Sequence, residues 1–195
     1  MKPLLDVHAL LWLLEDDPHE PAWRPGFALI ASDLGYNEAA NRVLEALAAT
    51  GFEFAFDAKR STTLAYLAEV CAFLGDEARA EVLYGLREPY RDMTITAGIV
   101  VVCHGSAGRY LGLLATTLAA WERAEEHFEA ALQVNGSMGA LPWLAHTQWD
   151  YARMLRRRGR AADLERSEVL LSEVWTTANR LDMVALKGRL RGQQH

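Results

Sequence analysis

Residues 109–131, RYLGLLATTLAAWERAEEHFEAA, contain the spacing that decides the fold. A large and a small residue stand side by side at Leu111-Gly112, and a small residue, Ala124, follows twelve positions later. Phe128 and Ala131 come four and seven positions after Ala124. A small residue on one helix lets a second helix approach closely, and a bulky neighbour fills the space beside the crossing. The stretch therefore predicts two antiparallel helices joined by a short turn.

The same spacing recurs along the chain. The large–small step appears at Phe27-Ala28, Leu67-Ala68, Leu111-Gly112 and Tyr151-Ala152, and seven positions after each small residue a turn is expected at Gly35, Gly75, Ala119 and Gly159. The second helices offer Ala40 with Leu44, Ala80 with Tyr84, and Ala124 with Phe128. The fourth pair departs from the pattern, because its best triplet, Ser167, Leu171 and Val174, needs three extra loop residues, with Asp163 capping the displaced helix start.

These regularities predict an all-α fold, an antiparallel helix-hairpin solenoid of about four divergent repeats. Helices are expected near 4–16, 24–34, 37–49, 61–74, 77–87, 100–119, 121–134, 141–158, 164–180 and 184–190. The predicted organisation is an N-terminal covering helix in 1–22, a repeat domain in 23–183, and a C-terminal helix or tail in 184–195. Ile95 to Val102 is rich in β-branched residues, but without a partner strand in the sequence it is interpreted as a connector. A plain helical bundle would share the apolar periodicity but not the repeated spacing.

Composition narrows the function class. The net charge is −6, which argues against direct nucleic-acid binding, because a phosphate backbone requires a basic surface. No stretch has the roughly 20 apolar residues of a membrane span. Two isolated cysteines, Cys71 and Cys103, indicate a reducing compartment, so a cytoplasmic location is expected. The apolar run from Leu4 to Leu14 is interrupted by Asp6 and lacks a cleavage site, which favours a helix over a signal peptide.

Residues 89–163 carry a closer likeness. The ordered set is Pro89-Tyr90, Gly105, Tyr110 to Leu114, Ala124-Glu125, Phe128, Ala131-Leu132, Asn135, Met138 to Ala140, Pro142 to Ala145, Asp150 to Ala152, Met154-Leu155 and Asp163. It resembles the tetratricopeptide-like C-terminal region of large bacterial signalling ATPases, namely LuxR-type transcriptional regulators and multidomain adenylate or guanylate cyclases. The resemblance extends over about residues 24–183. It implies a binding or regulatory role in signal transduction or transcription regulation, and no phosphate-binding loop of the G-x-x-x-x-G-K-[ST] type accompanies it.

The sequence offers little that indicates catalysis. Cys103-His104, with His146 on a neighbouring helix, is the one soft-ligand cluster, and no carboxylate at ligand spacing completes a metal site. Ser106 stands near His104 without the G-x-S-x-G pattern of a nucleophile elbow. We therefore expect a protein that is not an enzyme and needs no cofactor or metal.

On the first helix of each hairpin, four positions are expected to face inward. One lies three residues before the small residue, and the others lie one, four and five residues after it. In the third hairpin these include Arg109 and Thr116, and in the fourth Trp149, Arg153, Arg156 and Arg157, with His146 one turn earlier. An aromatic ring beside several cations suits an acidic peptide or partner domain bound in a concave groove. The alternative is that the arginines near 156–158 only favour the helix C-terminus through its dipole.

Two further hypotheses concern ligands and assembly. A helical domain that senses a small inducer is the alternative to the protein-interaction module. The leucines at Leu10, Leu11, Leu13 and Leu14 make the first expected helix apolar on more than one side. We therefore expect the terminal helices to join copies into a homo-oligomer or to dock onto another domain.

Overall fold

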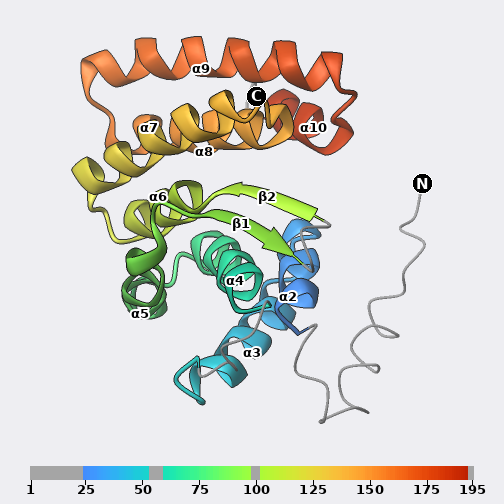
Figure 1. Ribbon diagram of the computed structural model, residues 1–195, viewed down its shortest axis with the longest axis vertical. Helices are drawn as coiled ribbons and strands as arrows, with labels where there is room; N and C mark the ends of the chain where they lie inside the picture. Colours follow the sequence, from blue (N-terminus) through green and yellow to red (C-terminus); the bar gives the residue numbers. More distant parts are fainter. Residues whose placement is uncertain (1–23, 53–58, 98–101, 193–195) are drawn as a thin grey trace.

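The computed structural model describes residues 24–52, 59–97 and 102–192, and it is predominantly helical (Figure 1). The helices are α2 (Arg24–Asp33), α3 (Asn37–Ala48), α4 (Arg60–Leu74), α5 (Glu77–Arg87), the short 3-10 helix η2 (Glu88–Tyr90), α6 (Ala107–Thr117), α7 (Trp121–Ser137), α8 (Leu141–Arg158), α9 (Ala161–Arg180) and α10 (Val184–Gly192). The strands are β1 (Thr94–Ala97) and β2 (Val102–Ser106). The all-helical prediction is confirmed for these ranges, apart from the two strands. The expected covering helix in 1–22 lies outside the described residues.

The long helices form antiparallel pairs, α2 with α3, α4 with α5, α6 with α7, and α8 with α9. The first helix of each pair also contacts the first helix of the next pair, so α2, α4, α6 and α8 pack in succession. The small residues that define the sequence pattern are buried at these crossings: Ala28, Ala68 and Ala152 are fully buried, as are Ala40, Ala80 and Ala124 on the second helices. The expected burial of the small positions is therefore confirmed.

The turns between paired helices also follow the sequence pattern. Gly35, Gly75, Ala119 and Gly159 have φ values of 79°, 68°, 53° and 76°, all in the left-handed region. A residue in this conformation ends a helix by satisfying its last carbonyl groups, and glycine adopts it without steric cost. Ala119 adopts it despite its side chain, and this strain at a predicted turn shows that the surrounding helices impose the conformation.

Helix α9, the second helix of the fourth pair, is capped by Asp163 at its start, as the sequence predicts. Helix α9 begins at Ala161, and the carboxylate of Asp163 accepts a hydrogen bond from the backbone N–H of Arg160 at 3.0 Å. Asp163 thus caps the helix from its third position. Ser167 and Val174 are buried and Leu171 is partly buried, so the displaced triplet does face the core.

The β-hairpin corrects the prediction for Ile95 to Val102 and for a helix beginning near residue 100. β1 and β2 pair antiparallel, with Thr94 opposite Ser106 and Ala97 opposite Val102. Ile95 on β1 is fully buried. The partner strand was missed because Val102–Ser106 was interpreted as the first turn of a helix, whereas helix α6 begins only at Ala107. The side chain of Ser106 caps it, accepting a hydrogen bond from the backbone N–H of Gly108.

The hairpin joins the two halves of the chain. β1 contacts α4, while β2 contacts α6, α7 and α8, and Figure 1 shows the hairpin between the α4 side and the α8 side. Gly105 has a φ of 74°, and a Cβ there would lie 2.8 Å from the Cβ of Trp143. Only glycine lets the end of β2 approach α8 this closely.

The C-terminal helix α10 packs on the fourth pair rather than extending away from it. Leu186 and Leu190 form a small second core with Trp149, Val174 and other apolar residues of α8 and α9. None of the helices within the described ranges combines the length and apolarity that crossing a membrane requires.

Candidate functional site

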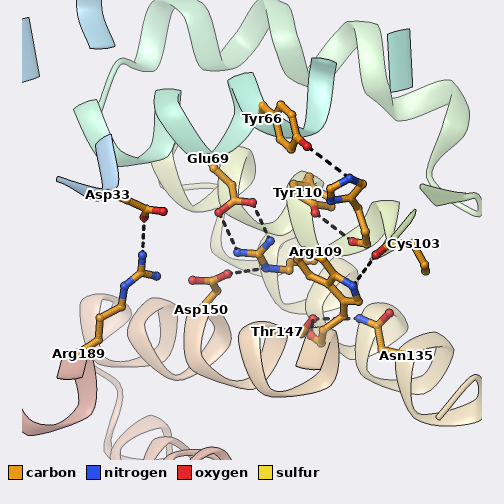
Figure 2. A network of polar contacts seen from close by, with 12 residues as sticks. Asp33, Tyr66, Glu69, Cys103, Arg109, Tyr110, Asn135, Thr147, Asp150 and Arg189 are labelled. Atoms are coloured by element: carbon orange, nitrogen blue, oxygen red, sulfur yellow. Dashed lines mark hydrogen bonds and ion pairs between the residues drawn. The ribbon is translucent and has the colours of Figure 1, made fainter. Parts of the chain in front are cut away.

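Three charged residues from three successive first helices meet on the inner side of the fold (Figure 2). The guanidinium of Arg109 on α6 donates from Nη1 and Nη2 to the two carboxylate oxygens of Glu69 on α4, at 3.0 and 3.2 Å. Its Nε donates to Oδ2 of Asp150 on α8, at 2.8 Å. The side chains are 3% exposed for Arg109, 6% for Asp150 and 23% for Glu69. One arginine thus ties together the first helices of three hairpins.

The sequence register explains why Arg109 and Glu69 face each other. Arg109 lies three positions before Gly112, and Glu69 lies one position after Ala68, so both occupy inward positions of their helices. The prediction considered these positions only in the third and fourth hairpins. Applying the same rule to α4 would have found Glu69. Asp150 lies two positions before Ala152, outside the rule, and no signal in the sequence indicates its part in the network.

The electrostatics of the three groups differ. Burial would lower the pKa of Arg109, but Glu69 and Asp150 outweigh burial and hold that pKa well above its usual range. Burial would raise the pKa of Glu69, but the bidentate contact with Arg109 lowers it below its ordinary value. Burial raises the pKa of Asp150, and Arg109 compensates for this only in part. Of the three residues, Asp150 is therefore the one whose charge is least well compensated by its neighbours.

A row of four aromatic rings borders the charged network. The ring centroids of Tyr66 and His104 are 5.4 Å apart, those of His104 and Trp143 5.5 Å, and those of Trp143 and His146 5.6 Å. The row runs from α4 across β2 to the start of α8. The indole Nε1 of Trp143 donates to the carbonyl oxygen of Cys103 at 2.7 Å, which fixes the strand against the helix.

Burial also sets the state of the imidazole at the end of this row. It lowers the pKa of His146 to about 4, and the nearby positive charge of Arg109 adds to the shift. His146 is therefore neutral at pH 7. We call the set Tyr66, Glu69, His104, Arg109, Trp143, His146 and Asp150 the inner site.

The hairpin side of the inner site is held by a buried amide. Asn135 on α7 is fully buried, accepts a hydrogen bond from the backbone N–H of Ser106 at 2.9 Å, and donates to the hydroxyl of Thr147 at 3.1 Å. Figure 2 shows the contact between Asn135 and Thr147 beside the charged network. The aromatic row is thus attached to both α7 and α8.

Of the predicted site residues, two belong to the inner site. Arg109 lies at its centre, but its guanidinium contacts carboxylates of the same chain rather than an open groove. His146 lies at the end of the aromatic row and is partly exposed. Trp149 is only 4% exposed and packs in the second core beneath Leu186 and Leu190. The helical register contains no sign that α10 covers this inward position.

The arginines of the predicted basic patch on α8 contact different neighbouring helices. Arg156 pairs with Glu168 on α9 at 2.5 Å. Arg157 donates to the backbone carbonyl of Thr116 at 3.4 Å, and its guanidinium lies 5.7 Å from the ring centroid of Trp121. The hydroxyl of Thr116 donates to a carbonyl of its own helix. Arg156 and Arg157 thus contact neighbouring helices, and Arg157 and Thr116, both predicted groove residues, contact each other.

Arg153 is the exception among the cations. It is exposed, one turn after Asp150, and it makes no hydrogen bond or ion pair with any residue in 24–52, 59–97 or 102–192. Arg189 on α10 also lies near the inner site and pairs with Asp33 at the end of α2 (Figure 2). This exposed pair links the first and last described helices at the edge of the site.

No set of three or more His, Cys, Asp or Glu side chains among the described residues is arranged to hold a metal ion. A scan against models of protein families and searches of curated proteins and of solved structures found no match to this chain. The likeness to signalling ATPases thus stays a prediction from the sequence. The structure defines a helical protein of four packed hairpins with one inserted β-hairpin. The inner site is the candidate functional site of this protein.

Proposed function

We propose that this chain is a non-catalytic helical-repeat module that binds a peptide or a segment of a partner protein at the inner site. The support comes from position: the inner site collects side chains from α4, α6 and α8 and from β2, and it combines aromatic rings with polar groups. Peptide-binding surfaces commonly combine rigid aromatic rings with a few fixed polar groups, because the rings bury area at low entropic cost.

The observation that carries the proposal is the unused hydrogen-bonding capacity of His146. Its imidazole touches Trp143, is neutral at pH 7, and makes no hydrogen bond with any residue that the structure describes. His146 is partly exposed, and its ring nitrogens are not among the unpartnered polar atoms that are sealed from solvent, so water or a ligand can reach them. A bound segment would supply the missing partner.

The family resemblance adds a biological setting to the proposal. We propose a cytoplasmic regulatory role in bacterial signal transduction or transcription regulation, in which the partner is another protein. A helical domain that senses a small molecule is the alternative, and it would use the same inner site.

The test is a selection of displayed random peptides against the full-length chain, followed by affinity measurements with fluorescence anisotropy. We expect His146→Ala to weaken the selected peptides by about fivefold or more, as for a residue at the centre of an interface. Leu164→Ala is the matched control, because Leu164 is 55% exposed on α9, away from the inner site. It should change affinity by less than about twofold. Failure to select peptides, or equal effects of the two substitutions, would refute the proposal.

A further inference from the structure

The hydrogen-bond donors of the inner site are largely occupied within the chain. Arg109 uses Nε, Nη1 and Nη2 on Asp150 and Glu69. The indole N–H of Trp143 is bound to the carbonyl of Cys103. A ligand that presents mainly acceptors, such as a carboxylate, would therefore compete with bonds that already exist.

Acceptors, in contrast, are left over. Asp150 uses Oδ2 on Arg109, while its Oδ1 accepts no hydrogen bond from a described residue and is not sealed from solvent. In Figure 2 this second oxygen points away from Arg109, toward the side where Arg189 and Asp33 lie. The neutral imidazole of His146, four residues before Asp150 and thus on the same face of α8, provides another acceptor nitrogen.

The charges of the inner site also favour a ligand that donates hydrogen bonds. Glu69 and Asp150 carry two negative charges, and Arg109 contacts both of them, whereas Arg153 acts on Asp150 and Arg189 on Glu69 only from a longer range. The second core and the packed helices keep most of this network from water. A buried carboxylate without a full counter-charge is costly, and a cation that reaches it is attracted more strongly than at an exposed surface. The faces of nearby aromatic rings also favour a cation.

We propose that the inner site recognises a nitrogen cation, the guanidinium or ammonium group of a basic side chain in the bound segment, which donates to Oδ1 of Asp150 beside His146 and Trp143. The inference rests on the proposed function and names the chemistry of its ligand. It replaces the acidic partner that the α8 arginines suggested, because Arg156 and Arg157 are engaged with neighbouring helices.

A substitution of Arg153 tests the proposal, because a cationic and an acidic ligand should respond to it with opposite changes in affinity. It is exposed at the rim, where its charge opposes an incoming cation. Arg153→Glu should therefore strengthen the binding of a cation, whereas it would weaken the binding of an acidic ligand. The charge of Arg189 is offset by its ion pair with Asp33.

The experiment uses the full-length chain and four small probes, N-acetyl-arginine amide, N-acetyl-lysine amide, N-acetyl-citrulline amide and N-acetyl-glutamate amide. Binding is followed by NMR through the tryptophan indole N–H signals, with the Trp143 signal assigned from the Trp143→Phe variant. Citrulline has nearly the shape of arginine but no charge, so it separates charge from shape. Asp150→Asn removes the carboxylate at constant size, and Arg180→Glu, on the exposed face of α9, repeats the charge change of Arg153→Glu elsewhere.

We expect the arginine or lysine probe to bind and the citrulline and glutamate probes not to bind. Asp150→Asn should weaken the cation by about tenfold, the worth of a hydrogen bond to a charged group. Arg153→Glu should strengthen it about two- to fivefold, and Arg180→Glu should have no such effect.

Three results would overturn the inference: binding of the glutamate probe that Arg153→Glu abolishes, cation binding that is indifferent to Asp150→Asn, or no binding by any probe. If selected peptides still depend on His146 in any of these cases, the proposed function survives and only the ligand class is wrong.

Discussion

Gly112 lies directly against the ring of Phe128, so closely that a Cβ on Gly112 would be 2.8 Å from three carbons of that ring. The two residues belong to α6 and α7, and Phe128 is fully buried. The contact sets the distance between the two helices of the third hairpin, and that hairpin carries Arg109 into the inner site.

Gly112→Ala should therefore destabilise the protein by about 1–3 kcal/mol, because the added methyl group forces the packed ring or its helix to move. Urea unfolding followed by circular dichroism measures the change. Gly85→Ala is the control, since Gly85 lies in helix α5 and a Cβ added there would meet no neighbouring group within 4 Å. That substitution should be neutral or stabilise by up to about 1 kcal/mol. Equal effects at the two glycines would contradict the close approach.

The strained turn at Ala119 gives a prediction of opposite sign. Ala119 has a φ of 53°, a conformation that costs a residue with a Cβ about 1 kcal/mol relative to glycine. Ala119→Gly should raise the free energy of unfolding by several tenths of a kcal/mol to about 1 kcal/mol, after the greater entropy of glycine in the unfolded chain is subtracted. The reciprocal change, Gly75→Ala at a φ of 68°, should destabilise. The urea midpoint reports both, and a lower midpoint for Ala119→Gly would be the contrary result.

The charged network predicts a large effect when its centre is removed. Arg109→Met leaves Glu69 and Asp150 without their cation and should cost about 3–5 kcal/mol. The triple variant with Glu69→Leu and Asp150→Leu added should recover most of this loss, because apolar replacement of a whole buried ion network is often tolerated. Chemical unfolding of the two variants at pH 7 makes the comparison. A triple variant as unstable as the single one would show that the network does more than balance its own charges.

Acid sensitivity should arise in part at the α8–α9 turn. Arg158 makes a bidentate contact with Asp163, at 2.8 and 2.7 Å, and this contact lowers the pKa of Asp163 from 3.8 to about 2. A carboxylate whose pKa is lower in the folded state adds stability above its unfolded pKa. That stability is lost as the pH falls from about 3.8 toward about 2.

Asp163→Asn should therefore make the free energy of unfolding less dependent on pH within this window, and urea titrations at several pH values measure the slope. Asp92→Asn, at a carboxylate that is 94% exposed, is the control and should leave the slope unchanged. An unchanged slope in Asp163→Asn would rule out this source of acid sensitivity.

The sequence by itself predicted most helices of the described residues, their pairing and the small residues at their crossings, although it placed the start of α6 too early and missed the two strands. It could do so because Ala28, Ala68, Gly112 and Ala152 act locally: a small residue at a fixed distance from a left-handed turn specifies a hairpin without reference to the rest of the chain. The register also predicted that Arg109 lines a groove, whereas the structure shows its side chain buried against Glu69 and Asp150.

Only the tertiary structure decided what Arg109 meets there. Its partner Glu69 lies 40 positions earlier in the chain and its partner Asp150 lies 41 positions later. Helical periodicity contains no information about contacts between residues so far apart. The pairing of β1 with β2 and the covering of Trp149 by α10 were hidden for the same reason. A side chain's direction follows from its own helix, but whether it meets water, a carboxylate or another helix depends on how distant elements pack.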